Sequence, residues 1–244
     1  MHPQLPWTAF LNKYLGGLVA AVLEALGIHP HDPHAPISNF VAMEILVAIL
    51  LLVFFVAVRS RLSVDRPGAL QHIMEGLHGF IEGQSQEIIG HHSEKFTPFL
   101  VTLGLFILVC NLIGMVPAFE SPTANPSVPL GCAICAFLYY NYQGMKKQGV
   151  LSYLKHFAGP MPLMAPLMSP IELISHVGRL LSLTVRLYAN MFAGEQVTLV
   201  FMGLVPLFVP AAFMGLHVFV AFLQALVFAL LTMIYVSSAV SHEH

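Results

Sequence analysis

The 244-residue chain is 57% apolar and 9% charged, with a formal net charge of −2 at pH 7. Soluble domains carry about 25% charged residues, so this composition excludes a water-soluble globular protein. The chain also has no basic cluster of the kind that binds nucleic acid. These features predict an all-α integral membrane protein whose main contact is the lipid bilayer.

Residues 1–37 precede the first continuous apolar run and are predicted to form a periplasmic or interfacial segment. Within it, residues 8–28 resemble an amphipathic stretch near the membrane surface. The segment lacks the basic start and cleavage site of a secretory signal and the Arg/Ser bias of an organelle transit peptide. We therefore expect a bacterial inner membrane.

Residues 38–244 are predicted to form a single membrane domain. Apolar runs at about 38–58, 96–116 and 128–145 are each close to the ~20 residues that cross ~30 Å of hydrocarbon. A turn separates the last two, since the stretch PAFESPTANPSVP has four prolines in thirteen residues and cannot form a regular helix.

Residues 67–93 have a different pattern. Apolar side chains recur there at helical spacing, while Glu75, Glu82 and Glu87 occupy other positions. This pattern is typical of an amphipathic helix that lies on the membrane surface rather than crossing it.

The last two segments, about 171–204 and 211–240, are free of proline and unusually long. A helix of ~34 residues measures ~51 Å, whereas the hydrocarbon is ~30 Å thick. Such a helix stays within the bilayer only if it tilts far beyond the usual ~20°. We therefore expect a steeply tilted hairpin, which brings the total to about five membrane-embedded helices plus the surface helix.

Lysine and arginine positions set the orientation, because cytoplasmic loops carry an excess of both. A periplasmic N-terminus leaves only Lys13 outside and places the C-terminus in the cytoplasm. The cytoplasmic side then holds Arg59, Arg61, Arg66, Lys95, Lys146, Lys147 and Lys155.

Arg186 lies deep within an apolar segment. A charge at mid-membrane costs about 2.5–3.5 kcal/mol on insertion scales, and a guanidinium does not lose its proton. Glu172 is the nearest carboxylate on the same helical face, but it lies ~21 Å away along the axis. We therefore expect an acidic partner on another polypeptide.

Helical geometry groups the polar residues around this cation. At 100° per residue, a stripe within about 80° of Glu172 contains Ser175, His176, Arg179, Ser182, Arg186 and Asn190. Glu195 lies about 140° away and nearer the outside, while His217, Gln224 and Tyr235 follow one line on the last helix. Two offset polar routes indicate that this protein transfers protons to another polypeptide and does not form a continuous pore.

Three stretches carry a specific resemblance: SLTVRLYANMFAGE at 182–195, NLIGMVPAFESPTAN at 111–125 and LHVFVAFLQALVFALLTMIYVS at 216–237. Together they resemble the subunit a family of F-type ATP synthases. The resemblance implies a non-catalytic, proton-translocating stator subunit that binds the c-ring and peripheral-stalk subunit b, without cofactor or metal.

The resemblance also implies residue roles. Arg186 matches the essential arginine that faces the c-ring carboxylate, and Glu172 matches an acid at the cytoplasmic mouth. Polar positions of the half-channel and rotor interface correspond to Asn190, Glu195, His217 and Gln224. Secondary candidates are Arg179, Ser182, His176 and Tyr235, and Arg179 is a position where the family varies.

Simpler interpretations stay open for several residues. Arg186 alone could be a structural ion pair, Arg179 could extend to the interface, and Asn190 and Gln224 could join helices by hydrogen bonds. Glu195 and His217 could satisfy each other. The histidines of 29–34 and 91–92 are interpreted as surface residues rather than metal ligands.

Two other protein classes were weighed. A haem- or quinone-binding subunit needs histidines on facing spans at matched depth, and only His176 and His217 lie in the long segments. A substrate transporter needs inverted repeats, which the two halves do not show.

Overall fold

The computed structural model describes residues 5–25, 36–63, 67–90, 93–116, 119–149, 165–204 and 208–240. Every regular element in these ranges is helical, which confirms the all-α prediction. The segments Asn39–Ser60 and Ala211–Val240 are long and apolar enough to cross a membrane, and Thr97–Ile113 is a shorter apolar helix.

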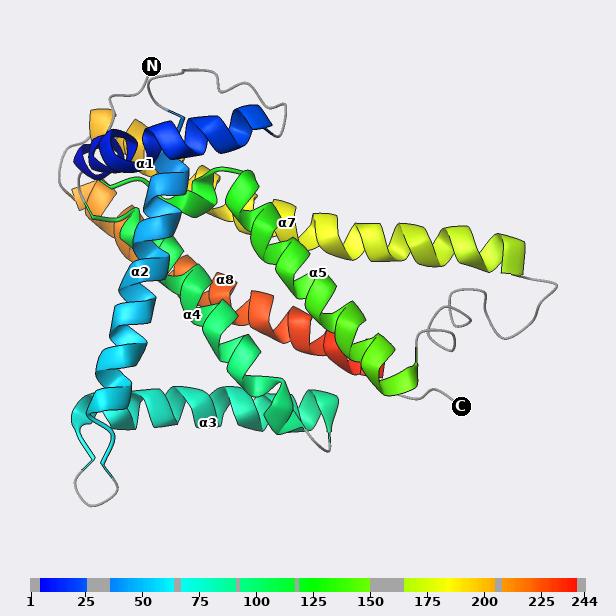
Figure 1. The fold of residues 1–244 in the computed structure, drawn as a ribbon. Helices are drawn as coiled ribbons and strands as arrows, with labels where there is room; N and C mark the ends of the chain where they lie inside the picture. The colour runs from blue at the N-terminus through cyan, green and yellow to red at the C-terminus, as the bar shows by residue number, and fades with distance from the viewer. Residues whose placement is uncertain are drawn as a thin grey trace.

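Helix α2 (Asn39–Ser60) runs between two helices that lie across its ends (Figure 1). These are α1 (Pro6–Ala25) at its start and α3 (Ala69–Ile89) at its far end. The 22 residues of α2 span ~33 Å, which is close to the thickness of the hydrocarbon layer. The two crossing helices therefore lie where the two membrane surfaces would be.

Polar contacts fasten α1 to the start of α2. The indole of Trp7 donates to the carbonyl of Ala42 over 2.9 Å. The side chain of Asn12 pairs with the backbone of Ile37 in both directions, at 3.0 Å each.

Helix α3 has the amphipathic character that the sequence predicts. Ile81 is buried in the bundle, whereas Glu82 lies 3.5 Å from His78 on the same helix. Its C-terminal end is tied to the last helix, because Ser237 donates to the carbonyl of Ile88 over 2.8 Å.

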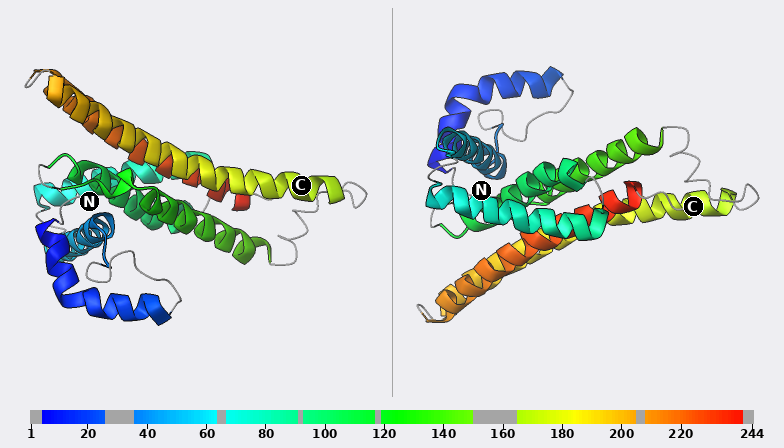
Figure 2. Two further views of the ribbon diagram at one scale, coloured as in Figure 1. Left: turned by 90° about the horizontal axis from the view of Figure 1, so that it is seen from above. Right: turned by 90° about the horizontal axis from the view of Figure 1, so that it is seen from below.

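The bundle has layers (Figure 2). Helices α4 (Thr97–Ile113) and α5 (Ser127–Gln148) lie between α1 and α2 on one side and the hairpin of α7 (Ala165–Leu204) and α8 (Phe208–Val240) on the other. One apolar core joins α4 and α5 to the hairpin, and it includes Ile107, Ala133, Leu187, Met191 and Phe228.

The hairpin is steeply inclined, as predicted: both arms lie at a large angle to α2 in Figure 1. Helix α7 begins at Ala165, earlier than the predicted start at 171, and it includes Pro170. A proline removes one backbone donor, and only the first four amides of a helix have no partner within it, whereas Pro170 is the sixth residue of α7. Pro170 therefore lies within α7 at the loss of one intrahelical hydrogen bond, whereas the start of α5 at Ser127 lies within one residue of the predicted 128.

The connection from α4 to α5 contains the short η2 turn (Pro122–Ala124) and a buried polar cluster. The hydroxyl of Thr123 donates to Asn111 over 2.7 Å, and the hydroxyl of Ser121 donates to the carbonyl of Cys110 over 3.1 Å. Gly114 permits this close approach, because a Cβ there would lie 2.5 Å from the Cβ of Ser121.

Candidate functional site

Arg186 points away from the bundle. Its neighbour Leu187 and, one turn on, Met191 are fully buried in the core shared with α4, α5 and α8. The Arg186 side chain is exposed, and it makes no hydrogen bond or ion pair with any residue in the described ranges. The cation is therefore presented outward from α7.

Several small side chains share this outward face with Arg186. Within about 60° of it around the helix, Ser175, Ser182, Ala189 and Ala193 are exposed, whereas Leu183 is buried and Arg179 is half-buried. Small residues allow another helix to come close. Part of the surface beside the arginine is thus lined by small side chains.

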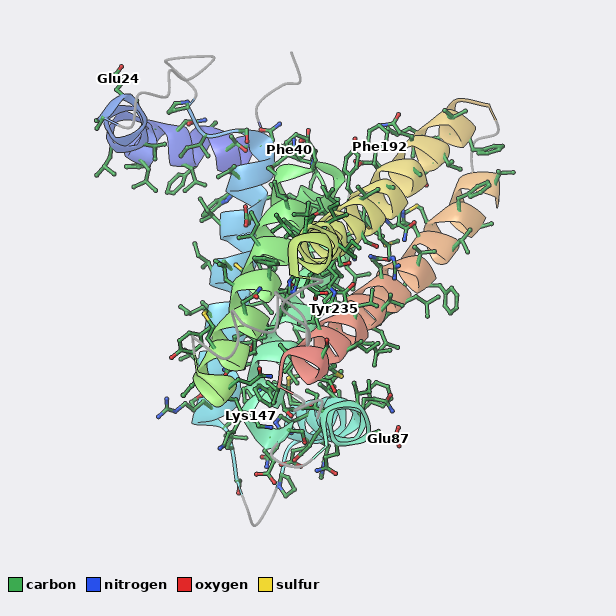
Figure 3. All side chains as sticks on the ribbon, turned by 90° about the vertical axis from the view of Figure 1, so that its right-hand side faces the viewer. Glu24, Phe40, Glu87, Lys147, Phe192 and Tyr235 are labelled. Carbon is green, nitrogen blue, oxygen red and sulfur yellow. The ribbon has the colours of Figure 1, made fainter. Side chains whose placement is uncertain are left out.

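Glu195 and His217, from different arms of the hairpin, line the same cavity of about 300 Å³. Ser121 and Gly114, from the connection after α4, contribute to its wall. In Figure 3, Phe192, one turn before Glu195, lies level with Phe40 near the start of α2. The cavity therefore belongs to the α1 end of the bundle.

A second cavity, of about 200 Å³, continues toward Arg186 and is lined by Asn190, Gly194 and His217. His217 thus stands in the wall between the two cavities. The imidazole of His217 packs directly against Gly194. A Cβ at position 194 would lie 2.5 Å from the Nδ1 of His217, so only glycine leaves room for the ring.

At the end of the second cavity nearest Arg186, a hydrogen bond joins α7 to α8. The amide of Asn190 donates to the Oε1 of Gln224 over 2.8 Å. The predicted residues Asn190, Glu195, His217 and Gln224 are thereby brought together on one side of Arg186. Their lining ends four residues, or ~6 Å along the axis, from the arginine.

A separate polar group lies on the other side of Arg186. The Nδ1 of His176 is 2.9 Å from the hydroxyl of Tyr140 on α5, and its Nε2 is 3.5 Å from Glu172. The guanidinium of Arg179 lies 5.3 Å from the ring centre of Tyr235. That ring lies 5.9 Å from the ring of Tyr140, so one group contains all five side chains.

The predicted stripe on α7 therefore divides. His176 turns inward and is 6% exposed, whereas Ser175, Ser182 and Arg186 face outward. Tyr235, which the spacing placed in line with His217 and Gln224 on the last helix, contacts the group that contains His176, and it lies well below Phe192 in Figure 3.

Tyr140 is not among the residues predicted from the sequence. It is one of three tyrosines within four residues of an apolar run, and nothing in the pattern separates it from Tyr139 or Tyr142. Only the packing of α5 against α7 brings its hydroxyl to His176.

The histidines of 29–34 and 91–92 lie outside the described residues. Within the described ranges, no group of three His, Cys, Asp or Glu side chains could hold a metal ion.

Comparison with known proteins identifies the family. The family model described as ATP synthase A chain matches residues 40–237. The protein named ATP synthase subunit a of Koribacter versatilis (strain Ellin345) is 53% identical over 244 residues, covering 100% of both chains. The protein of the same name from Solibacter usitatus (strain Ellin6076) is 57% identical over 233 residues, 96% of this chain and 99% of that protein. This chain therefore belongs to the ATP synthase A chain family.

Proposed function

We propose that this chain is the proton-translocating stator subunit of an F-type ATP synthase. In this role it faces the rotating c-ring and is held by peripheral-stalk subunit b. It makes and breaks no bonds of ATP itself. Membership of the ATP synthase A chain family supports this assignment. The same membership gives no support to a haem- or quinone-binding subunit.

The observation that carries the proposal is the placement of Arg186. Its charge faces outward from a membrane helix, and the described residues offer it no counter-charge. A permanent charge in hydrocarbon is costly, so an acidic group on a neighbouring chain would stabilise it. A ring carboxylate is the partner that fits.

The outer half-route is proposed to run through the two cavities. A proton would pass from Glu195 to His217 and then along Asn190 and Gln224. Histidine suits such a step, because its charge changes near neutral pH. The route would end beside Arg186, where the proton neutralises a ring carboxylate and lets that site turn into lipid.

The inner half-route is proposed to run along the group that contains His176 and Glu172. A ring site that returns after nearly a full turn would release its proton there and pair briefly with Arg186. The arginine would thus prevent direct leakage between the routes. Each proton that crosses ~100 mV releases about 2.3 kcal/mol, so several must cross for each ATP.

The same proposal orients the chain in a bacterial inner membrane. Residues 1–37 would be periplasmic or interfacial, and 38–244 would form one membrane domain with a cytoplasmic C-terminus. The position of α1 and α3 across opposite ends of α2 supports this orientation, because Arg59 lies at the α3 end.

The proposal is tested by Arg186→Ala in inverted membrane vesicles. We expect proton-driven ATP synthesis to be lost while the ATPase activity of the catalytic sector persists. Arg59→Ala, which removes an exposed guanidinium at the end of α2, is the matched control and should retain synthesis. Retained synthesis in Arg186→Ala would defeat the assignment.

A further inference from the structure

The contact between Tyr140 and His176 joins two helices inside the bundle. Tyr140 is 1% exposed and His176 is 6% exposed, and the hydroxyl lies 2.9 Å from Nδ1. The other ring nitrogen, Nε2, lies 3.5 Å from Oε1 of Glu172. The imidazole therefore has one nitrogen against a phenol and the other beside a carboxylate.

The two neighbours differ in chemistry. A phenol hydroxyl can donate or accept a hydrogen bond, so it serves both the neutral and the protonated imidazole. An ionised carboxylate only accepts, and it can take up a proton. With Nδ1 engaged by Tyr140, proton exchange takes place at Nε2, which is the nitrogen that faces Glu172.

We propose that Tyr140 is a positioning residue for proton transfer on the inner half-route, since it holds His176 with Nε2 directed at Glu172. This inference rests on the proposed function and adds a residue to it. The imidazole takes up the proton that a returning ring site releases, and the resulting imidazolium gives its Nε2 proton to the ionised carboxylate of Glu172 at Oε1, which leaves a neutral imidazole and a neutral carboxylic acid. The acid then releases the proton to the cytoplasmic side.

The exposure of the group fits this direction of transfer. The side chain of His176 is 8% exposed, whereas that of Glu172 is 37% exposed. The relay therefore leads from the packed interior of the hairpin to an accessible carboxylate. Without the hydroxyl, the ring could turn about its side-chain bonds and lose this alignment.

Among the described residues, charged and titratable side chains near His176 come from three helices. Glu172 and Arg179 lie on α7 itself, Tyr140 comes from α5, and Tyr235 comes from α8. Phe137 adds an edge-on aromatic contact at 6.2 Å. Because the Tyr140 hydroxyl lies at Nδ1, Nε2 is the nitrogen that faces Glu172.

The test uses the assembled complex in inverted vesicles, where the medium sets the pH on the cytoplasmic side. Tyr140→Phe keeps the aromatic packing and removes one hydroxyl. We expect the rate of ATP synthesis to fall about three- to ten-fold, the usual worth of one hydrogen bond, and its dependence on medium pH to shift. Tyr139→Phe, which retains the stack on Phe99 at 3.8 Å, is the control and should leave the pH dependence unchanged.

A second set of variants uses His176→Gln. It should remove the pH-dependent step that Tyr140→Phe shifts, and the double variant should behave like His176→Gln alone. Glu172→Gln should remove the same step without disturbing the core. An unchanged pH dependence in Tyr140→Phe, or a shift that persists in the His176→Gln background, would overturn the inference.

The stator function and the relay through Tyr140, His176 and Glu172 can be tested independently. Loss of synthesis in Arg186→Ala together with an unchanged Tyr140→Phe profile would remove the relay and leave the stator function standing. Synthesis that persists in Arg186→Ala would remove both.

Discussion

Asn190 of α7 donates a 2.8 Å hydrogen bond to Gln224 of α8, one helical turn beyond Arg186. Gln224 is 4% exposed whereas Asn190 is exposed, so the bond joins a buried amide of α8 to the surface of α7, and breaking it removes a hydrogen bond from a buried polar group. The contact fixes the spacing of the two arms where the lining of the outer cavities ends. It also gives both amides a role in packing that can coexist with a role in proton transfer.

The bond between Asn190 and Gln224 predicts strong coupling between their substitutions. Asn190→Ala and Gln224→Ala should each slow ATP-driven acidification of vesicles, and the double variant should be less impaired than the product of the two. Hydrogen bonds between membrane helices contribute about 0.6 kcal/mol on average and up to about 1.7. A double-mutant cycle on the pumping rate measures this coupling, and purely additive effects would count against the pairing.

Glu195→Gln and His217→Ala should slow proton uptake from the outer side without preventing assembly. Both side chains line the 300 Å³ cavity, and general acid–base groups contribute about 10²–10⁴-fold to proton-transfer steps. Glu120→Gln is the control, because Glu120 accepts a hydrogen bond from Asn39 over 3.3 Å and a glutamine can still accept it. Unchanged acidification in both cavity variants would mean that the outer route lies elsewhere.

Gly194→Ala should impair proton transfer through its effect on His217. The added Cβ would lie 2.5 Å from Nδ1 and 2.9 Å from Cε1 of the ring, so the imidazole must move out of the wall between the cavities. Gly203→Ala on the same helix meets nothing within 4 Å and should be harmless. Rates of proton-driven synthesis in the two variants make the comparison, and equal rates would show that the position of His217 is unimportant.

Gly114→Ala should destabilise the connection between α4 and α5. Its Cβ would lie 2.9 Å from the backbone nitrogen and Cα of Ser121, and backbone cannot move aside as a side chain can. Overpacking of this kind costs about 1–3 kcal/mol. Gly131→Ala, which has open space around it, is the control, and thermal denaturation of the purified complex should show a lower midpoint for Gly114→Ala alone.

Much of the fold could be predicted from the sequence because a membrane imposes simple lengths. The surface helix followed from its helical periodicity, and the tilt of α7 and α8 followed from segments too long for the bilayer. The start of α7 was harder to place, because a proline is expected to end or begin a helix, whereas Pro170 lies inside α7 as its sixth residue.

Neighbouring site residues could be predicted where they lie on the same helix. Contacts between residues of different helices could not be predicted as well. The spacing around Arg186 placed Ser182 and Asn190 near it. Angles along α7 alone could not show that His176 turns inward to Tyr140. Tyr235 was likewise assigned to a line on α8, although its neighbours are Tyr140 on α5 and Arg179 on α7.

The central claim is that the face of α7 around Arg186 meets an acidic partner on the rotor. Disulfide cross-linking tests it most directly, with the three native cysteines replaced and one cysteine placed beside the acidic residue of the ring subunit. Ser182→Cys lies about 40° from Arg186 around the helix, and Leu181→Cys lies about 140° away; both positions are exposed. The account predicts a cross-linked product with the ring subunit for Ser182→Cys and none for Leu181→Cys. Equal cross-linking of both, or cross-linking of Leu181→Cys alone, would contradict it.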